Sequence, residues 1–465
     1  MQILNFKNVI PDTRGRQIVL IIAILAGFIT QFDSSAVNIA LPSIGNDFAL
    51  NAILLSWVTT SYLLATAAFL ITFGKVSDIY GREKVFRTGI IVFTIASFGL
   101  TLVPSAGLLI AMRVVQGIGS AMIFGTAVAI LTNLSSPGER GKVLGIYITA
   151  VYFGLSAGPL FGGLLTHYLG WRSIFLINVP IGIIAALLTT RYLKNECIEG
   201  RKERFDIVGA IVYGISIFSL MFGFSRVPDP LGISILAAGV IGLLIFLIYE
   251  SRVRFPVLDV RIFLGNKVFA LSNLAALISY SSTYAVTFLL SLYLQYTQNL
   301  TADKAGLILI AQPVMMALIS SLSGRLSDTI EPRIVASIGM AITTTGLFLL
   351  IFLSAITPLW YLIVSLVIIG IGYGLFTSPN TNAVMSSVEQ KVYGVANGII
   401  GTVRLLGQIL SMGIATMIFS IIIGHVIITP DYYPQFMTSL SVAFTFFTVF
   451  CFFGIFASLV RGKIR

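Results

Sequence analysis

Long apolar runs alternate with short polar segments along almost the whole chain. A bilayer core takes about 20 apolar residues per helix, and fourteen runs approach that length. Gly or Pro interrupts many of them, as membrane spans tolerate. The pattern therefore predicts an all-α polytopic membrane protein. The predicted spans are 18–41, 52–73, 85–103, 106–131, 143–165, 172–190, 207–224, 231–249, 268–292, 304–322, 334–353, 358–378, 394–420 and 438–460.

Composition points to a membrane rather than to water as the solvent. Hydrophobic residues make up 57% of the chain and charged residues 10%, against about 25% charged residues in soluble domains. The net charge of +11 comes from short scattered groups, which argues against a nucleic-acid partner. Two histidines and two distant cysteines, Cys197 and Cys451, argue against a metal site and a disulfide framework. The first 17 residues lack the apolar core of a signal peptide.

Basic residues distinguish the two sides of the membrane. With the N-terminus inside, 24 of the 29 Lys and Arg residues fall on one side, and only Arg172, Arg226 and Lys304 fall on the other. The remaining two, Arg113 and Arg404, lie inside spans. Because Lys and Arg gather on cytoplasmic loops, we expect a multi-pass plasma-membrane protein with both termini in the cytoplasm.

A short segment recurs at matching places in two halves of the chain. The stretch "GKVSD" (74–78) follows the second span, and "GRLSD" (324–328) follows the tenth. If spans 7 and 8 are an insertion, the tenth span is the second helix of a second six-helix bundle. Internal duplication is typical of transporters whose halves alternate about a midplane site. The predicted units are a six-helix bundle (1–190), a linker with two extra spans (191–267) and a second six-helix bundle (268–465).

Five segments, in order, resemble motifs of the major facilitator superfamily, and within it of the fourteen-span drug:proton antiporters. They are "FDSSAVNIALP" (32–42), "GKVSDIYGREK" (74–84), "RVVQGIGSA" (113–121), "GLSAGPLFGG" (154–163) and "GWRSIFLINVPIG" (170–182). The second loop copy departs from the pattern, with "TIEPR" after Asp328 in place of "IYGRE". The resemblance covers essentially the whole chain. It implies the major facilitator fold and antiport driven by a proton gradient, with no cofactor.

Asp33 is the one acidic residue of eighteen placed well inside a predicted span. A charge at that depth costs at least about 2.5–3.5 kcal/mol on insertion scales, and such groups are usually functional. Helical spacing gives span 1 one polar face and span 4 another. These faces carry Thr30, Asp33, Ser34 and Asn38, and Arg113, Gln116 and Ser120.

In the superfamily the first and fourth helices of each bundle line the central cavity, so the resemblance places Asp33 and Arg113 in one wet space. Asp33 is predicted to carry the proton and Arg113 to tune its proton affinity. Asn38 and Gln116 are predicted to contact substrate. The alternative is a buried ion pair with a purely structural role.

The loop after the second span is predicted to act as a cytoplasmic latch. Gly74 and Gly81 suit a turn. Asp78 can pair with Arg82, or with the positive N-terminal end of a helix in the other bundle, and its repetition as Asp328 favours this role. The alternative is a solvated loop that only sets topology, in which exposed ion pairs contribute roughly 0–1 kcal/mol.

Span 5 carries glycines at four-residue spacing, which fall on one helix face and allow another helix to approach closely. They are Gly154, Gly158 and Gly162, and Pro159 is expected to kink the same helix. Close packing of this face against the other half could seal a leak path between states. Ordinary tight packing is the alternative.

Span 9 presents a polar and aromatic face, with Tyr280, Tyr284, Thr287, Ser291 and Gln295. Tyrosine rings attract cations and suit varied lipophilic ligands, so Tyr280, Tyr284 and Gln295 are predicted to bind substrate. Helix packing with an interfacial aromatic belt is the alternative. Arg404 is read as a structural or coupling residue.

The function indicated is proton-driven export of lipophilic compounds that carry one positive charge or none. Its partners would be small molecules, protons and lipids, and the protein is expected to be a monomer. A narrow-specificity exporter of a tetracycline-like compound, a lipid or a metabolite is the alternative. The chain lacks the clustered acids, histidines or metal ligands of a lipid enzyme, the re-entrant sequence of a channel and a G-x-x-x-x-G-K-S/T nucleotide loop.

Overall fold

The computed structural model describes the chain except for residues 1–12, 136–138, 194–204, 328, 390–392 and 463–465. The described part is helical, and all fourteen predicted spans are confirmed as long apolar helices. The helices are α1 (Thr13–Phe48), α2 (Ala52–Tyr80), α3 (Arg82–Thr101), α4 (Ala106–Leu134), α5 (Arg140–Leu169), α6 (Arg172–Tyr192), α7 (Ile207–Phe224), α8 (Pro230–Glu250), α9 (Arg261–Gly265), α10 (Lys267–Leu292), α11 (Ala302–Leu309), α12 (Ala311–Leu326), α13 (Pro332–Leu350), α14 (Leu359–Ser386), α15 (Tyr393–Ile422) and α16 (Tyr433–Val460).

The tenth span is bent, since α11 ends at Leu309 and α12 begins at Ala311. Pro313 lacks the backbone N–H that would bond back to Leu309 across this point, which accounts for the break. The ninth span instead runs on beyond α10 through one π-helical turn, Tyr293–Thr297. Each of these two spans, Lys267–Thr297 and Ala302–Leu326, is still one membrane-crossing element by its length and hydropathy.

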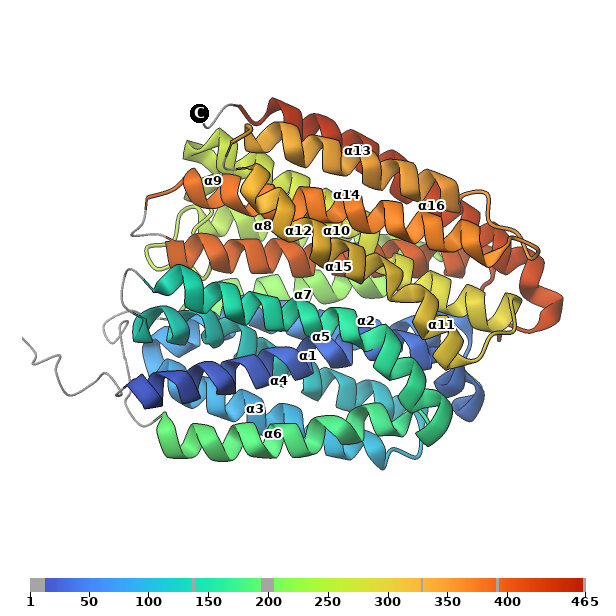
Figure 1. The fold of residues 1–465 in the computed structure, drawn as a ribbon, viewed down its shortest axis with the longest axis horizontal. Helices are drawn as coiled ribbons and strands as arrows, with labels where there is room; N and C mark the ends of the chain where they lie inside the picture. The colour runs from blue at the N-terminus through green and yellow to red at the C-terminus, as the bar shows by residue number, and fades with distance from the viewer. Residues whose placement is uncertain (1–12, 136–138, 194–204, 328, 390–392, 463–465) are drawn as a thin grey trace, which may run out of the picture.

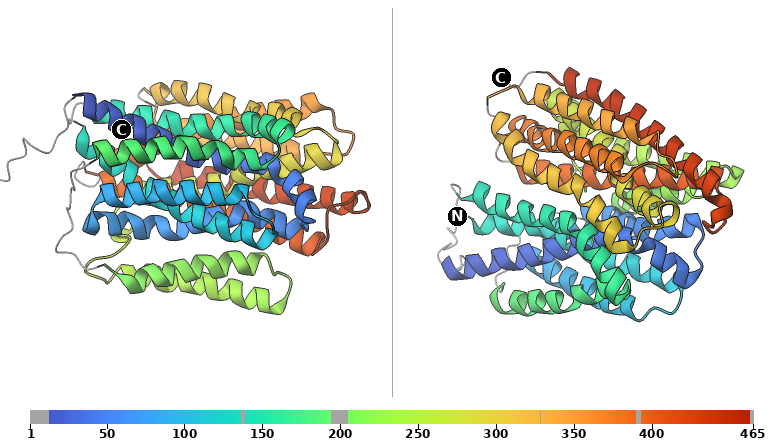
Figure 2. Two further views of the ribbon diagram at one scale, coloured as in Figure 1. Left: turned by 90° about the horizontal axis from the view of Figure 1, so that it is seen from below. Right: turned by 45° about the vertical axis from the view of Figure 1, so that its right-hand side comes forward.

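The helices form two bundles and a separate pair (Figures 1 and 2). Helices α1–α6 form the first bundle and α10–α16 the second, while α7 and α8 lie beside them and pack through α7 on α2 and α15. Aromatic and small side chains make this contact, with the Trp57 and Phe222 rings 6.5 Å apart and Gly413 set against Phe224. This architecture is the predicted all-α fold.

The two ends of the molecule differ. We call the end that holds the α2–α3, α8–α10 and α12–α13 connections and the C-terminus of α16 the basic end, because the basic loops of the sequence fall there. The other end, with the α1–α2, α5–α6 and α10–α11 connections, is called the distal end. In Figure 2 (right) the two bundles converge at the distal end, near α11, and spread apart toward the termini.

Backbone contacts join the bundles at the distal end. The amide of Ala52 donates to the carbonyl of Val426 at 3.1 Å. A Cβ added to Gly163 of α5 would lie 2.4 Å from the carbonyl oxygen of Ala302. By contrast, Gly145 of α5, at the basic end, has nothing within 4 Å of that position. One helix therefore touches the opposite bundle at its distal end and is open at its basic end.

Candidate functional site

The two ionisable residues predicted to share a site are joined by a buried ion pair. Arg113 Nη1 lies 2.5 Å from Asp33 Oδ2, and both side chains have no exposed surface. The other carboxylate oxygen accepts hydrogen bonds from Gln116 at 3.0 Å and from Asn178 at 2.9 Å. Helices α1, α4 and α6 thus supply one compact polar cluster inside the first bundle.

Aromatic rings cover this cluster. The Arg113 guanidinium carbon lies 4.4 Å from the centre of the Tyr62 ring and 5.8 Å from that of Phe175. Arg113 Nε donates to the carbonyl of Val58 at 3.1 Å. A neutral, hydrogen-bonded ion pair sealed by apolar rings is stable at membrane depth, where a lone charge is not. Protonation of Asp33 would remove that neutrality, so the cluster is suited to sensing one proton.

The remaining predicted substrate contacts fall in two places. Asn38 is buried in the first bundle and accepts a hydrogen bond from Thr59 at 3.0 Å, and Gln116 belongs to the ion-pair cluster. Tyr284 meets Ser34 across the two bundles, with 3.0 Å between the hydroxyls. Gln295 donates to the carbonyl of Ile39 at 2.9 Å, also across the bundles. Tyr284 and Gln295 therefore join the two bundles, at mid-span and nearer the distal end respectively.

Tyr280 lies four residues before Tyr284 on α10, nearer the basic end. Its ring makes an edge contact with Tyr373 of α14, with 5.9 Å between centres. Arg404 of α15 lies near these tyrosines, since Gly407, about one helical turn further along α15, packs against Tyr280. Tyr280 is thus part of a second charged cluster, separate from Asp33.

The loop motif forms one of the two pairs expected for Asp78. Arg82 Nε donates to Asp78 Oδ1 at 2.9 Å, a contact between positions four apart across the α2–α3 turn. Gly81 makes that turn with φ of 107°, which favours glycine. Gly74 does not belong to the turn as predicted, because it lies inside α2, where Gly125 of α4 packs against its backbone. Asp328 lies outside the described residues.

The glycine face of α5 packs on its own bundle. A Cβ at Gly154 would lie 2.6 Å from the carbonyl oxygen of Phe28, and Gly158 and Gly162 similarly face Ser35 and Ala36 of α1. In this structure the face therefore makes the tight helix packing that was the alternative interpretation, and its partner is α1 and not the other half. Two neighbouring positions of α5 contact the other bundle instead. Gly163 packs against the carbonyl of Ala302, and the carbonyl of Pro159 packs against Gly306.

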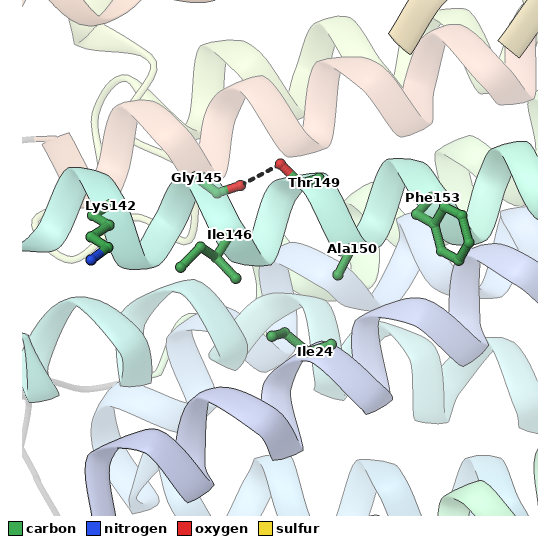
Figure 3. Close-up of a pocket in the computed structure, with 7 residues that line it drawn as sticks. All are labelled: Ile24, Lys142, Gly145, Ile146, Thr149, Ala150 and Phe153. Carbon is green, nitrogen blue, oxygen red and sulfur yellow. Dashed lines mark hydrogen bonds between the residues drawn. The ribbon is translucent and has the colours of Figure 1, made fainter. Parts of the chain in front are cut away.

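A groove opens along the basic half of α5 (Figure 3). It has a volume of about 560 Å³ and is almost wholly apolar, with Lys142 at one end. Its lining residues are Ile24, Lys142, Gly145, Ile146, Thr149, Ala150 and Phe153. All of its lining residues belong to α1 and α5 of the first bundle.

Two of the polar contacts that sequence reasoning missed involve α5 and α6. Asn178, which completes the shell of Asp33, stood inside a quoted motif, and its amide within the apolar run of α6 was the available signal. His167 of α5 lies 3.7 Å from Asp303 of α11 at the distal end. No spacing rule links those two helices, so nothing in the sequence indicated that pair.

Comparison with known proteins agrees with this architecture. The model of the "Major Facilitator Superfamily" matches residues 23–412. The riboflavin transporter RibZ of Clostridioides difficile is 33% identical over 410 residues, 88% of each chain. The cephamycin export protein CmcT of Amycolatopsis lactamdurans is 32% identical, covering 86% of this chain and 84% of its own. The multidrug resistance protein Stp of Mycobacterium tuberculosis is 29% identical, covering 86% and 75%.

Solved structures share the fold at low sequence identity. A bacterial homologue of the human lysosomal transporter Spinster, in an inward-facing and unoccupied conformation, superposes with a TM-score of 0.72 at 16% identity, covering 97% of this chain and 98% of its own. The family match spans most of the chain, and two relatives exceed 30% identity over more than four-fifths of it. The chain therefore belongs to the Major Facilitator Superfamily.

Proposed function

We propose that this chain exports lipophilic small molecules in exchange for protons by alternating access. Membership of the Major Facilitator Superfamily makes it a multi-pass membrane transporter and not an enzyme. The observation that carries proton exchange is the fully buried Asp33–Arg113 pair, the one carboxylate at mid-span in the described chain. Export is supported by relatives named for multidrug resistance, cephamycin export and puromycin resistance.

Alternating access is supported by the way the bundles meet. They are joined by the Ser34–Tyr284 hydrogen bond near mid-span and by the Gln295–Ile39 hydrogen bond toward the distal end, and Gly145 faces open space at the basic end. We infer that the basic end faces the cytoplasm of a plasma-membrane protein, because basic loops face the cytoplasm. On that orientation, the structure represents a state open to the cytoplasm.

A narrow-specificity exporter is the second candidate. The riboflavin transporter named above favours it, since that relative is named for one compound, riboflavin. For a broad or a narrow exporter alike, the structure gives no support to the preference for cations expected from the sequence, which relied on Asp33 as a free negative charge. Arg113 already neutralises Asp33, so this carboxylate has no charge to spare for a cationic ligand.

The test is accumulation of a panel of lipophilic dyes, antibiotics and riboflavin in cells that express the protein. We expect lower accumulation of several structurally unrelated compounds, with accumulation restored when a protonophore collapses the gradient. Efflux of a single compound would establish the narrow-specificity exporter. Efflux that is insensitive to the protonophore would refute proton exchange.

Replacing Asp78 with asparagine is expected to slow efflux by up to about fivefold. Asp78 keeps part of its side chain exposed beside Arg82. When the basic end closes, we expect this carboxylate to meet the N-terminal end of a helix in the other bundle, a contact that contributes about 0.3–1 kcal/mol to the closed state. The measurement is thiol labelling of a cysteine placed at Gly398, which has open space around it at the basic end. Labelling should increase as the state closed at that end becomes less populated.

Asp259→Asn is the matched control. Asp259 also pairs with an arginine at the basic end, and the Arg261 side chain holds the pKa of Asp259 below its usual range. The Asp259–Arg261 pair joins residues only two apart, and it lies in the connection between α8 and α9 and not in the turn between α2 and α3. If Asp78→Asn and Asp259→Asn gave equal labelling and equal efflux, the α2–α3 loop would serve only to set the membrane topology.

A further inference from the structure

A second charged cluster lies between the bundles and is not explained by proton exchange through Asp33. Its centre is Arg404 on α15, and four tyrosine hydroxyls lie in its electrostatic neighbourhood. They belong to Tyr147 and Tyr152 of α5, Tyr280 of α10 and Tyr373 of α14. Tyrosines of both bundles thus lie around this guanidinium.

Arg404 lacks a counter-ion. In the described part of the chain it makes neither a hydrogen bond nor an ion pair, and its Nε is buried without a partner. Arg113, the other arginine inside a span, has Asp33, Gln116 and a backbone carbonyl. A half-buried guanidinium that lacks a counter-ion favours an acceptor that carries negative charge.

The tyrosines give this positive site aromatic walls. Tyr280 and Tyr373 are in edge contact, and the hydroxyl of Tyr147 is buried without a hydrogen-bond partner. Gly407, three residues after Arg404, lets α10 approach so closely that an added Cβ would lie 2.6 Å from Tyr280 Cβ. Aromatic rings pack on planar ligands through offset or edge geometry, and a guanidinium binds carboxylates and phosphates through paired hydrogen bonds.

The cluster lies on the open side of the contacts that join the bundles. Tyr280 precedes Tyr284 on α10, and Tyr284 makes the mid-span contact with Ser34. Tyr147 faces Gly27 of α1, which precedes Ser34 on a helix running from the basic end. A compound entering between the spread bundles therefore meets Arg404 before it reaches the closed end.

We propose that Arg404 and its surrounding tyrosines form the substrate site, and that this site prefers aromatic compounds bearing one carboxylate, sulfonate or phosphate charge over cations. The inference rests on the proposed export function and names its substrate class. It also assigns the two charged clusters different tasks. Asp33 and Arg113 handle the proton, and Arg404 binds the anion.

The experiment is a binding titration of the purified protein with two dyes that share one skeleton. 8-Anilinonaphthalene-1-sulfonate is an anion, and N-phenyl-1-naphthylamine lacks the sulfonate and is neutral. Arg404→Gln should weaken binding of the anion by about tenfold or more, as expected for losing a charge-assisted hydrogen bond. Binding of the neutral dye should change by less than about twofold.

Two further variants sharpen the result. Arg404→Lys keeps the charge and should recover part of the affinity for the anion. Arg261→Gln removes an exposed arginine at the basic end and should leave both dyes unaffected. An equal loss of both dyes in Arg404→Gln would identify Arg404 as a packing residue, and unchanged binding of the anion would overturn the proposal.

Competition in the unmodified protein covers the case in which Arg404→Gln does not fold. Benzoate should displace the anionic dye at lower concentration than benzyl alcohol, and benzylammonium should be the weakest of the three. Stronger displacement by benzylammonium would overturn the anion preference. Binding is measured without a gradient, so absent efflux with Arg404-dependent binding would refute only the export function.

Discussion

Asp33→Asn is expected to abolish gradient-driven efflux while leaving exchange of substrate across the membrane intact. Asparagine has nearly the same shape and can still hydrogen-bond to Gln116 and Asn178. It cannot gain or lose a proton, so the proton gradient can no longer bias one state over the other. We expect the efflux rate to fall at least about a hundredfold, because no other described acid lies at mid-span.

The measurement uses proteoliposomes with and without an imposed proton gradient. Net transport driven by the gradient should disappear, whereas exchange of labelled for unlabelled substrate should persist. A variant that lost both activities would have lost its structure rather than its coupling. Retained efflux that still followed pH would show that the proton is carried elsewhere.

A double variant separates coupling from charge balance. In Asp33→Asn alone, Arg113 is left buried without its counter-ion, and such an unpaired charge costs about 3–5 kcal/mol. Asp33→Asn with Arg113→Gln removes both charges together. We expect the double variant to recover thermal stability but not gradient-driven transport. Recovery of both would assign the pair a structural role.

The sequence predicted the helices well because bilayer depth imposes one requirement on every span. Each needs about 20 apolar residues with its backbone satisfied internally, and this requirement can be counted residue by residue. The pairing of Asp33 with Arg113 was also foreseeable, since two opposite charges at mid-depth are stable only when they pair with each other or face a water-filled cavity. Asn178 fits the same logic, because an amide inside an apolar helix needs a partner.

Partners between helices were much less predictable. Helical spacing placed Gly154, Gly158 and Gly162 on one face but did not reveal that α1 covers it. Gly163 is the next residue, and the turn of the helix points it at the other bundle. Arg404 could be placed inside a span, but its four tyrosines come from three other helices. Such assemblies depend on tertiary packing, which local spacing does not encode.

Gly163→Val is expected to reduce efflux by about tenfold or more by keeping the distal end from closing. The added Cβ would lie 2.4 Å from the carbonyl oxygen of Ala302 and 3.2 Å from Asp303 Cα, both in the α11 backbone. Backbone atoms of a packed helix cannot rotate out of the way as a side chain can. The bundles must therefore separate at the distal end, which favours the state closed at the basic end. The state open at the basic end becomes less populated, and the transport cycle slows because it needs both states.

Gly145→Val supplies the control on the same helix. It carries the same cost of a β-branched residue in a helix, yet Gly145 has nothing within 4 Å of its Cβ position. Spin labels at Ile146 and Val395, both exposed, would report the spacing of α5 and α15 at the basic end. We expect shorter distances in Gly163→Val and unchanged distances in Gly145→Val. If Gly163→Val kept both the original distances and the original efflux, the contact with Ala302 would not be the surface on which the distal end closes.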